Sequence, residues 1–249
     1  MNRPKRISRI ENSAGERLAF TLTPGRPNGD EIVVLGHGLT SDKERPWSEA
    51  LAIGLAREGI ASIRIAFSGN GESEGAFLES TITKEVADLG AVLDALHERG
   101  GNVSYVGHSM GGAVGLLRAA MDPRIRNLVS LAPITHAEEF VRRMFGHLRH
   151  GDPMLDKDHC PYGPALERDL LAWGSLATKA SEVTVPWLVV HGTEDDIVPV
   201  RHSIDLHAAA PDALELVKLQ GVDHSFSGAG LDQMTRVVLP WLRSRVMRP

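Results

Sequence analysis

The sequence predicts an α/β fold in which a mostly parallel central sheet has helices on both faces. Short apolar runs alternate with longer amphipathic segments along most of the 249 residues, a pattern typical of parallel strands joined by crossover helices. The runs are also continuous rather than alternating, as in Glu31 to Leu35 (EIVVL). Such runs indicate strands that are buried on both faces, as central strands of a parallel sheet are.

The predicted elements follow one another in a regular order. An edge hairpin is expected over 7–10 and 17–23, because two β-prone runs flank the turn-prone residues 12–15. Further strands are predicted over 31–35, 60–65, 103–106, 127–131, 185–190 and 214–219, and helices over 46–58, 81–99, 110–121 and 231–246. The second of these helices has Thr81 or Thr83 as its N-cap and extends to about Arg99.

The alternation of strands and helices stops between residues 134 and 181. This stretch contains prolines, aromatic side chains and many histidines and arginines, but no clear strand. We interpret it as a cap inserted over the sheet edge, within a single domain that covers residues 1–249. Phe140 and Trp173 are expected either to line a pocket or to anchor the cap. The basic residues are expected to form a solvated helix face, with attraction of an acidic acyl or leaving group as the alternative.

Composition excludes several classes of partner. The formal net charge of −5 offers no broad basic surface, so no nucleic acid is expected to bind. The single cysteine, Cys160, excludes a disulfide framework within the chain. No apolar run follows the basic N-terminal residues and none is long enough to span a bilayer, so we expect no signal peptide, no membrane partner and a cytoplasmic location. No metal or cofactor is expected, and the oligomeric state, including a homodimer, stays open.

A catalytic motif lies in the stretch Val103 to Gly115 (VSYVGHSMGGAVG), where an apolar strand passes through a glycine-flanked serine into a helix of small residues. Ser109 is the serine of a G-x-S-x-G frame, the turn that lifts a serine hydroxyl above the carboxyl edge of a sheet. The glycines are needed because only residues without Cβ allow a close approach to this strained turn. The motif therefore predicts Ser109 as a nucleophile.

A serine nucleophile needs a base within hydrogen-bond reach, and that base needs an orienting acid. Residues 191–199 (HGTEDDIVP) offer three acids after one late strand, and residues 223–226 (DHSF) offer His224 after the last strand. The carboxyl ends of parallel strands lie along one edge of a sheet, so both loops are expected to converge there with Ser109.

With these motifs the chain resembles the α/β-hydrolases over nearly its whole length, and among them the serine-dependent esterases grouped with bacterial feruloyl and cinnamoyl esterases. The matching segments, in chain order, are HGLT at 37–40, FSGNGES at 67–73, GHSMGG at 107–112, HGTEDDIVP at 191–199 and GVDHSF at 221–226. The resemblance implies an α/β-hydrolase fold in which Ser109 is the nucleophile, His224 the general base and Asp195 the orienting carboxylate, with Glu194 and Asp196 as alternatives to Asp195.

The same resemblance implies an oxyanion hole made of backbone N–H groups, those of Leu39 and Met110. His37 is expected to brace the turn that carries Leu39. His108 is expected to point away from the site and to serve packing.

The function expected from these residues is hydrolysis of small to medium carboxylic esters through an acyl-enzyme intermediate, with a small-molecule ester as substrate. Thioesterase, lactonase and peptidase activities need the same three residues and stay open. A hydrolase-fold protein that binds a ligand without turnover is an alternative from a different class. The substrate itself depends on the cap over 134–181, where the sequence is least informative.

Overall fold

The computed structural model describes residues 7–26, 29–97 and 101–246. Within these ranges seven strands form one sheet in the order β1-β3-β2-β4-β5-β8-β9, and only β1 runs antiparallel to its neighbour. The strands are β1 (Phe20–Thr23), β2 (Glu31–Gly36), β3 (Ala61–Ile65), β4 (Asn102–His108), β5 (Ile125–Leu131), β8 (Trp187–Gly192) and β9 (Leu214–Leu219). The predicted mostly parallel sheet is confirmed.

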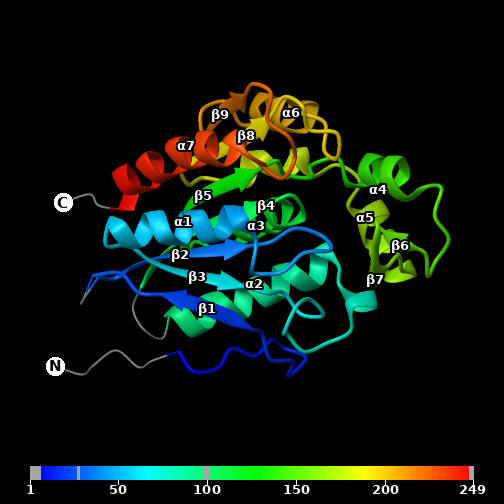
Figure 1. The fold of residues 1–249 in the computed structure, drawn as a ribbon, viewed down its shortest axis with the longest axis horizontal. Coiled ribbons are helices and arrows are strands. Elements are labelled where there is room, and N and C mark those ends of the chain that lie inside the picture. The colour runs from blue at the N-terminus through cyan, green and yellow to red at the C-terminus, as the bar shows by residue number, and fades with distance from the viewer. Residues whose placement is uncertain (1–6, 27–28, 98–100, 247–249) are drawn as a thin grey trace.

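Helices cover both faces of this sheet (Figure 1). One face packs against α1 (Pro46–Arg57) and α7 (Ala229–Val246), and the other against α2 (Ile82–His97), α3 (Met110–Met121) and α6 (Arg201–Ala209). Along β2, Val33 lies in the first core and Val34 in the second, because successive side chains of a strand point to opposite faces. No helix in the described ranges combines the length and apolar character needed to cross a membrane.

The N-terminal hairpin was predicted only in part. Residues 7–10 form no strand, and the two sides of the turn are joined by a bridge between Glu11 and Arg17 and by backbone hydrogen bonds from Leu18 N to Ile10 O at 2.9 Å and from Asn12 N to Glu16 O at 3.0 Å. The second arm does become β1, which pairs with β3 at the sheet edge as expected. Among the described residues the first arm pairs with no strand, so its β-prone residues join no ladder there.

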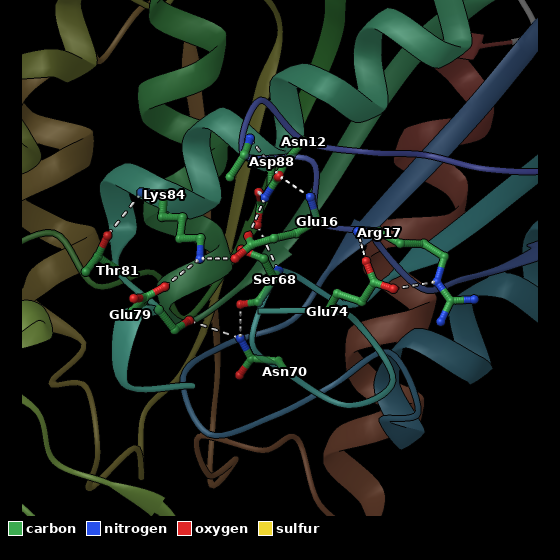
Figure 2. Close-up of polar contacts among 12 residues, drawn as sticks. Asn12, Glu16, Arg17, Ser68, Asn70, Glu74, Glu79, Thr81, Lys84 and Asp88 are labelled. Atoms are coloured by element: carbon green, nitrogen blue, oxygen red, sulfur yellow. Dashed lines mark hydrogen bonds and ion pairs between the residues drawn. The ribbon is translucent and has the colours of Figure 1, made fainter. Parts of the chain in front are cut away.

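Polar contacts fix this N-terminal segment to the loop before α2 (Figure 2). The buried Asp88 carboxylate of α2 accepts hydrogen bonds from Asn12 Nδ2 and from the backbone N–H of Ser68, both at 2.8 Å. Asn70 donates to the Ser68 carbonyl oxygen at 3.1 Å. These bonds hold the FSGNGES loop, whose first residue, Phe67, contacts His37 in the turn after β2.

The ends of two helices refine the predictions. Lys84 N donates to Thr81 Oγ1 at 3.1 Å, so Thr81 rather than Thr83 is the cap of α2. The predicted end of this helix at Arg99 lies outside the described residues. Sequence reasoning missed α6, because His202 and Ser203 occupy its buried face and interrupt the apolar period on which the prediction relied.

The cap over 134–181 lies between β5 and β8 in sequence. It contains α4 (Ala137–Phe145), β6 (Pro153–Met154), β7 (Lys157–Pro161), α5 (Pro164–Trp173) and the 3₁₀ helix η2 (Leu176–Glu182). Figure 1 shows α4, α5 and the β6-β7 hairpin beyond the ends toward which β2, β3 and β5 point. The cap therefore lies at the carboxyl edge of the sheet, where the predicted site residues are expected.

The expectation that the cap holds no strand was wrong, because β6 and β7 pair as an antiparallel hairpin. Their two-residue turn is Leu155-Asp156, and both residues have positive φ, 51° and 57°. Turns of this geometry usually carry Asn-Gly or Asp-Gly. The unusual Leu-Asp pair, together with strands too short for a clear alternation, hid the hairpin from sequence reasoning.

Candidate active site

Ser109 lies in the turn between β4 and α3, with φ 56° and ψ −116°. Backbone hydrogen bonds hold this strained conformation: Ser109 N donates to Leu131 O at 2.8 Å, and Ile134 N donates to Ser109 O at 3.2 Å. A Cβ on Gly111 would collide with the carbonyl oxygens of Gly36 and His37. The glycine after the serine is therefore required by the packing of the turn against β2, as the motif predicts.

Asp195 and His224, which come from the loops after β8 and β9, meet directly. The Nδ1 atom of His224 lies 2.7 Å from Asp195 Oδ2, and the Asp195 side chain is fully buried. Since a carboxylate accepts, Nδ1 carries the proton of this bond, and the Nε2 lone pair of a neutral His224 is left free. The two alternatives, Glu194 and Asp196, are exposed.

The Asp195 carboxylate is held by a further set of donors. Its Oδ1 accepts hydrogen bonds from the backbone N–H groups of Ile197 at 3.0 Å and Val198 at 2.7 Å. His191 Nε2 lies 3.1 Å from its Oδ2. Burial raises the pKa of Asp195, but the hydrogen bonds from His191, His224 and Val198 outweigh burial and hold the pKa well below its usual value. Asp195 is therefore ionised at neutral pH.

His108 lies closer to the site than its expected packing role suggests. Its Nε2 donates to the backbone carbonyl of His224 at 2.9 Å, and the two rings lie 4.7 Å apart between centroids. The ring also packs against Trp47 and Phe226. Burial, reinforced by the charge of His224, lowers the pKa of His108 to about 3. A neutral His108 thus fixes the backbone of the loop that carries His224.

This burial predicts a dependence of stability on pH. The pKa of His108 in the fold, about 3, is below its ordinary value of 6.5, so at pH values below 6.5 the unfolded chain binds a proton that the folded chain excludes. The unfolding free energy should therefore fall with decreasing pH, by about 1.4 kcal/mol per pH unit for one such histidine. In urea unfolding between pH 6 and pH 4, His108→Gln should show a pH slope shallower by that amount.

The matched control is His147→Gln, which removes an exposed histidine of the cap. Comparing variants with the wild type cancels the contributions of other titrating groups, including Glu85, whose burial raises its pKa. Equal slopes for the wild type and His108→Gln would contradict the prediction.

The turn after β2 lies against Ser109. A Cβ on Gly38 would be 2.8 Å from the Cβ of Ser109. His37 is fully buried and braces this turn as expected, because its Nδ1 donates to Gly38 O at 2.8 Å and its Nε2 accepts from Phe67 N at 3.0 Å. Burial lowers the pKa of His37 to about 4, so the ring is neutral and can keep both bonds.

Two backbone donors remain free beside the serine. In the described part of the chain, the N–H groups of Leu39 and Met110 donate to no protein acceptor. Met110 is the first residue of α3, where the helix dipole places partial positive charge. The two donors, one from each turn, are therefore available to a ligand oxygen.

A cavity of about 200 Å³ opens above Ser109. It is lined by Gly38, Leu39, Thr40, Ser41, Arg45, His108, Ser109, Phe140, Leu155, Lys157, Ile197, His224 and Ser225. The lining thus combines predicted site residues with side chains of the cap. Phe140 lines the cavity, whereas Trp173 anchors the cap by donating from Nε1 to Thr83 Oγ1 at 3.1 Å.

Sequence reasoning missed Arg45 and Lys157 as cavity residues. It had treated the basic residues of the cap as a solvated face, and several of these are indeed paired at the surface, such as Arg142 with Glu138 and His150 with Glu167. Lys157 differs because it lies on the hairpin that the sequence did not reveal, and its Nζ donates to Thr40 O at 2.7 Å.

The sheet order, the strained serine turn and the cap at the carboxyl edge define an α/β-hydrolase fold. Comparison with known proteins agrees. Residues 27–150 match a family of hydrolases described as serine aminopeptidase, S33. The match to this family, together with the fold, supports a hydrolase with an α/β-hydrolase fold.

Among curated proteins, the chain is 26% identical over 217 residues to the human alpha/beta hydrolase domain-containing protein 17B, covering 86% of this chain and 67% of that protein. The chain spans between 57% and 67% of the length of the five curated relatives compared.

Two solved structures share the fold. Est1E from Butyrivibrio proteoclasticus, with ferulic acid bound, superposes with a TM-score of 0.84 at 23% identity, covering 96% of this chain and 99% of that chain. The monoacylglycerol lipase of Paleococcus ferrophilus superposes with a TM-score of 0.74 at 18% identity, covering 92% and 99%. At these identities the likeness is one of fold. The expected resemblance to a feruloyl-type esterase is therefore confirmed at the level of the fold.

Proposed function

We propose that this chain is a serine hydrolase that cleaves small to medium carboxylic esters through an acyl-enzyme on Ser109. The observation that carries the proposal is the arrangement around one cavity. Ser109 and His224 line it, His224 binds the buried Asp195 at 2.7 Å, and two free backbone N–H groups lie beside the serine. Acyl transfer needs these three parts: a nucleophile, an oriented base and donors for an oxyanion.

In the acylation step, Nε2 of His224 takes the proton of Ser109 Oγ while Oγ attacks the ester carbonyl carbon. Asp195 keeps the proton on Nδ1, which leaves Nε2 free to act as the base, and its negative charge stabilises the imidazolium that forms. The carbonyl oxygen becomes an oxyanion that accepts from the N–H groups of Leu39 and Met110. One such donor typically contributes roughly 3 kcal/mol to the transition state.

The tetrahedral intermediate then collapses. The C–O bond to the alcohol breaks, protonated His224 gives its proton to the leaving oxygen, and the acyl group stays on Ser109 Oγ. In deacylation His224 takes a proton from water, the hydroxide oxygen attacks the acyl carbon, and the proton returns to Oγ as the carboxylic acid leaves.

The preference for esters of modest size is supported by the cavity. Its volume is about 200 Å³, and Leu39, Phe140, Leu155 and Ile197 supply an apolar lining suited to a short acyl chain. Two structural neighbours point to ester chemistry by their names: Est1E holds ferulic acid, a carboxylic acid, and the Paleococcus protein is named for a monoacylglycerol.

A second candidate is peptidase activity, because the matching family is described as a serine aminopeptidase. The same three residues would serve it, as they would a thioesterase or a lactonase. A binding protein without turnover needs none of the three, so the presence of Ser109 and His224 around one cavity, with His224 bonded to Asp195, favours an enzyme.

A substrate panel tests the proposal. The purified chain is assayed with 4-nitrophenyl butyrate, butyryl thiocholine and leucine 4-nitroanilide, and separately treated with a fluorophosphonate probe whose adduct is mapped by mass spectrometry. We expect the highest kcat/KM for the ester and an adduct on Ser109. Preference for the anilide would favour the peptidase, and a folded chain that neither turns over any substrate nor forms the adduct would refute a serine hydrolase.

A further inference from the structure

Two cationic side chains line the cavity above Ser109. Arg45, the residue before α1, and Lys157 of the cap both contribute to it, and they approach from different parts of the chain. In the described part of the chain, neither side chain has a carboxylate oxygen within 4.0 Å. The only protein acceptor of Lys157 Nζ in that part is the carbonyl oxygen of Thr40, at 2.7 Å. Among the described residues, both charges therefore lack an ionic partner.

The lining of this cavity includes no acidic residue. Of its other titratable members, His108 is neutral, because burial lowers its pKa to about 3, and His224 is engaged with Asp195, which lies behind it and does not line the cavity. The electrostatic character of the space next to Ser109 is therefore positive, in a chain whose net charge is −5.

A second cavity, of about 430 Å³, adjoins the first and shares Arg45 and Lys157 with it. Acids line this outer space: Asp42 and Glu44. Glu44 is neutralised by Arg64 at 2.8 Å and Lys43 at 2.9 Å, but Asp42 has no ion pair among the described residues. The positive charge is thus concentrated at the junction of the two cavities and in the inner cavity, rather than spread along both.

We propose that the physiological ester carries a carboxylate, which Arg45 and Lys157 bind next to Ser109. This inference rests on the proposed function and adds the substrate class to it. A charge-assisted hydrogen bond is about twice as strong as a neutral one, and an arginine can hold a carboxylate through two parallel bonds. An anionic substrate also supplies the ionic partner that the two cations lack among the residues described by the structure.

The carboxylate has two places in an ester, the acyl part and the alcohol part, and two matched substrate pairs separate them. The acyl pair is 4-nitrophenyl hemiadipate and its methyl diester, methyl 4-nitrophenyl adipate. The alcohol pair is 4-carboxyphenyl butyrate and 4-carbamoylphenyl butyrate. In each pair the quantity measured is the ratio of kcat/KM for the anionic ester to kcat/KM for the neutral one, after subtraction of hydrolysis without enzyme.

We expect this ratio to exceed about ten in one of the two pairs, as one charge-assisted hydrogen bond can provide. The ratio should fall by about tenfold or more in Arg45→Gln and in Lys157→Gln, and should decrease with rising salt. The neutral ester corrects for general damage, which matters for Lys157 because its Nζ also holds the Thr40 carbonyl. Arg168→Gln is the matched control, since Arg168 is exposed in the cap and lines neither cavity.

A ratio near or below one in both pairs, or a ratio unchanged by Arg45→Gln and Lys157→Gln, would overturn the inference while leaving the esterase proposal intact. Binding provides a readout that needs no turnover. In the Ser109→Ala chain, calorimetry should give tighter binding of the anionic member of the preferred pair, and Arg45→Gln should abolish the difference. Equal affinities in the Ser109→Ala chain would count against the inference, whether or not the wild-type chain hydrolyses esters. Absence of ester hydrolysis by the wild-type chain would instead refute the proposed function.

Discussion

Replacing Ser109 by alanine is expected to lower kcat/KM for 4-nitrophenyl butyrate by about 10⁴- to 10⁶-fold, the range seen when a serine nucleophile is removed. The physical reason is that the acyl intermediate forms on the Ser109 hydroxyl, which alanine lacks. The fold should survive, because the backbone bonds from Ser109 N to Leu131 and from Ile134 to Ser109 O do not involve the hydroxyl. Initial rates, together with circular dichroism of both chains, measure the effect.

The control for this variant is Ser181→Ala, which makes the same chemical change at an exposed position at the end of the cap. It should retain the wild-type rate and the fluorophosphonate adduct. If the folded Ser109→Ala chain kept the full rate, Ser109 would not be the nucleophile, and the mechanism would have to be abandoned.

Asp195→Asn is expected to lower kcat by about 10³- to 10⁴-fold, with little change in the size or shape of the side chain. Asp195 accepts from His224 Nδ1 and from two backbone N–H groups. An asparagine that accepts from the backbone presents its NH₂ to His224, so that Nδ1 must become the acceptor and the ring proton moves to Nε2. His224 can then no longer take the proton of Ser109.

The neighbouring Asp196→Asn is the matched control, since Asp196 is exposed and one residue away. It should change kcat less than about threefold, because surface substitutions away from a site rarely matter. A larger loss from Asp196→Asn than from Asp195→Asn would contradict the orienting role of Asp195 and assign it to Asp196. The comparison thus tests the choice between Asp195 and Asp196.

Much of the fold could be predicted because its central elements are locally encoded. Helix α3 and strand β9 begin and end at the predicted residues, since an apolar run or a small-residue helix with clear boundaries needs no distant information. The β6-β7 hairpin and α6 could not be predicted for the opposite reason. The two strands are short and α6 has polar residues on its buried face, so these elements are stabilised mainly by the segments they pack against.

The candidate site divides in the same way. The turn around Ser109 was predictable because its glycines answer a local steric need, and the convergence of the loops that carry Ser109, Asp195 and His224 follows from parallel strands that end at one edge. The role of His108 was not predictable, because its bond to the His224 carbonyl joins residues 116 positions apart. No pattern of neighbours along the chain carries that contact.

The sequence by itself determined the α/β class, the serine turn and the loops that carry Asp195 and His224, because strand burial, helix periodicity and glycine sterics act over a few residues. Only the tertiary structure decided which carboxylate meets His224, where His108 donates, and that Arg45 and Lys157 line one cavity. These are matters of distance and direction between remote segments, and they depend on how the sheet and the cap pack together.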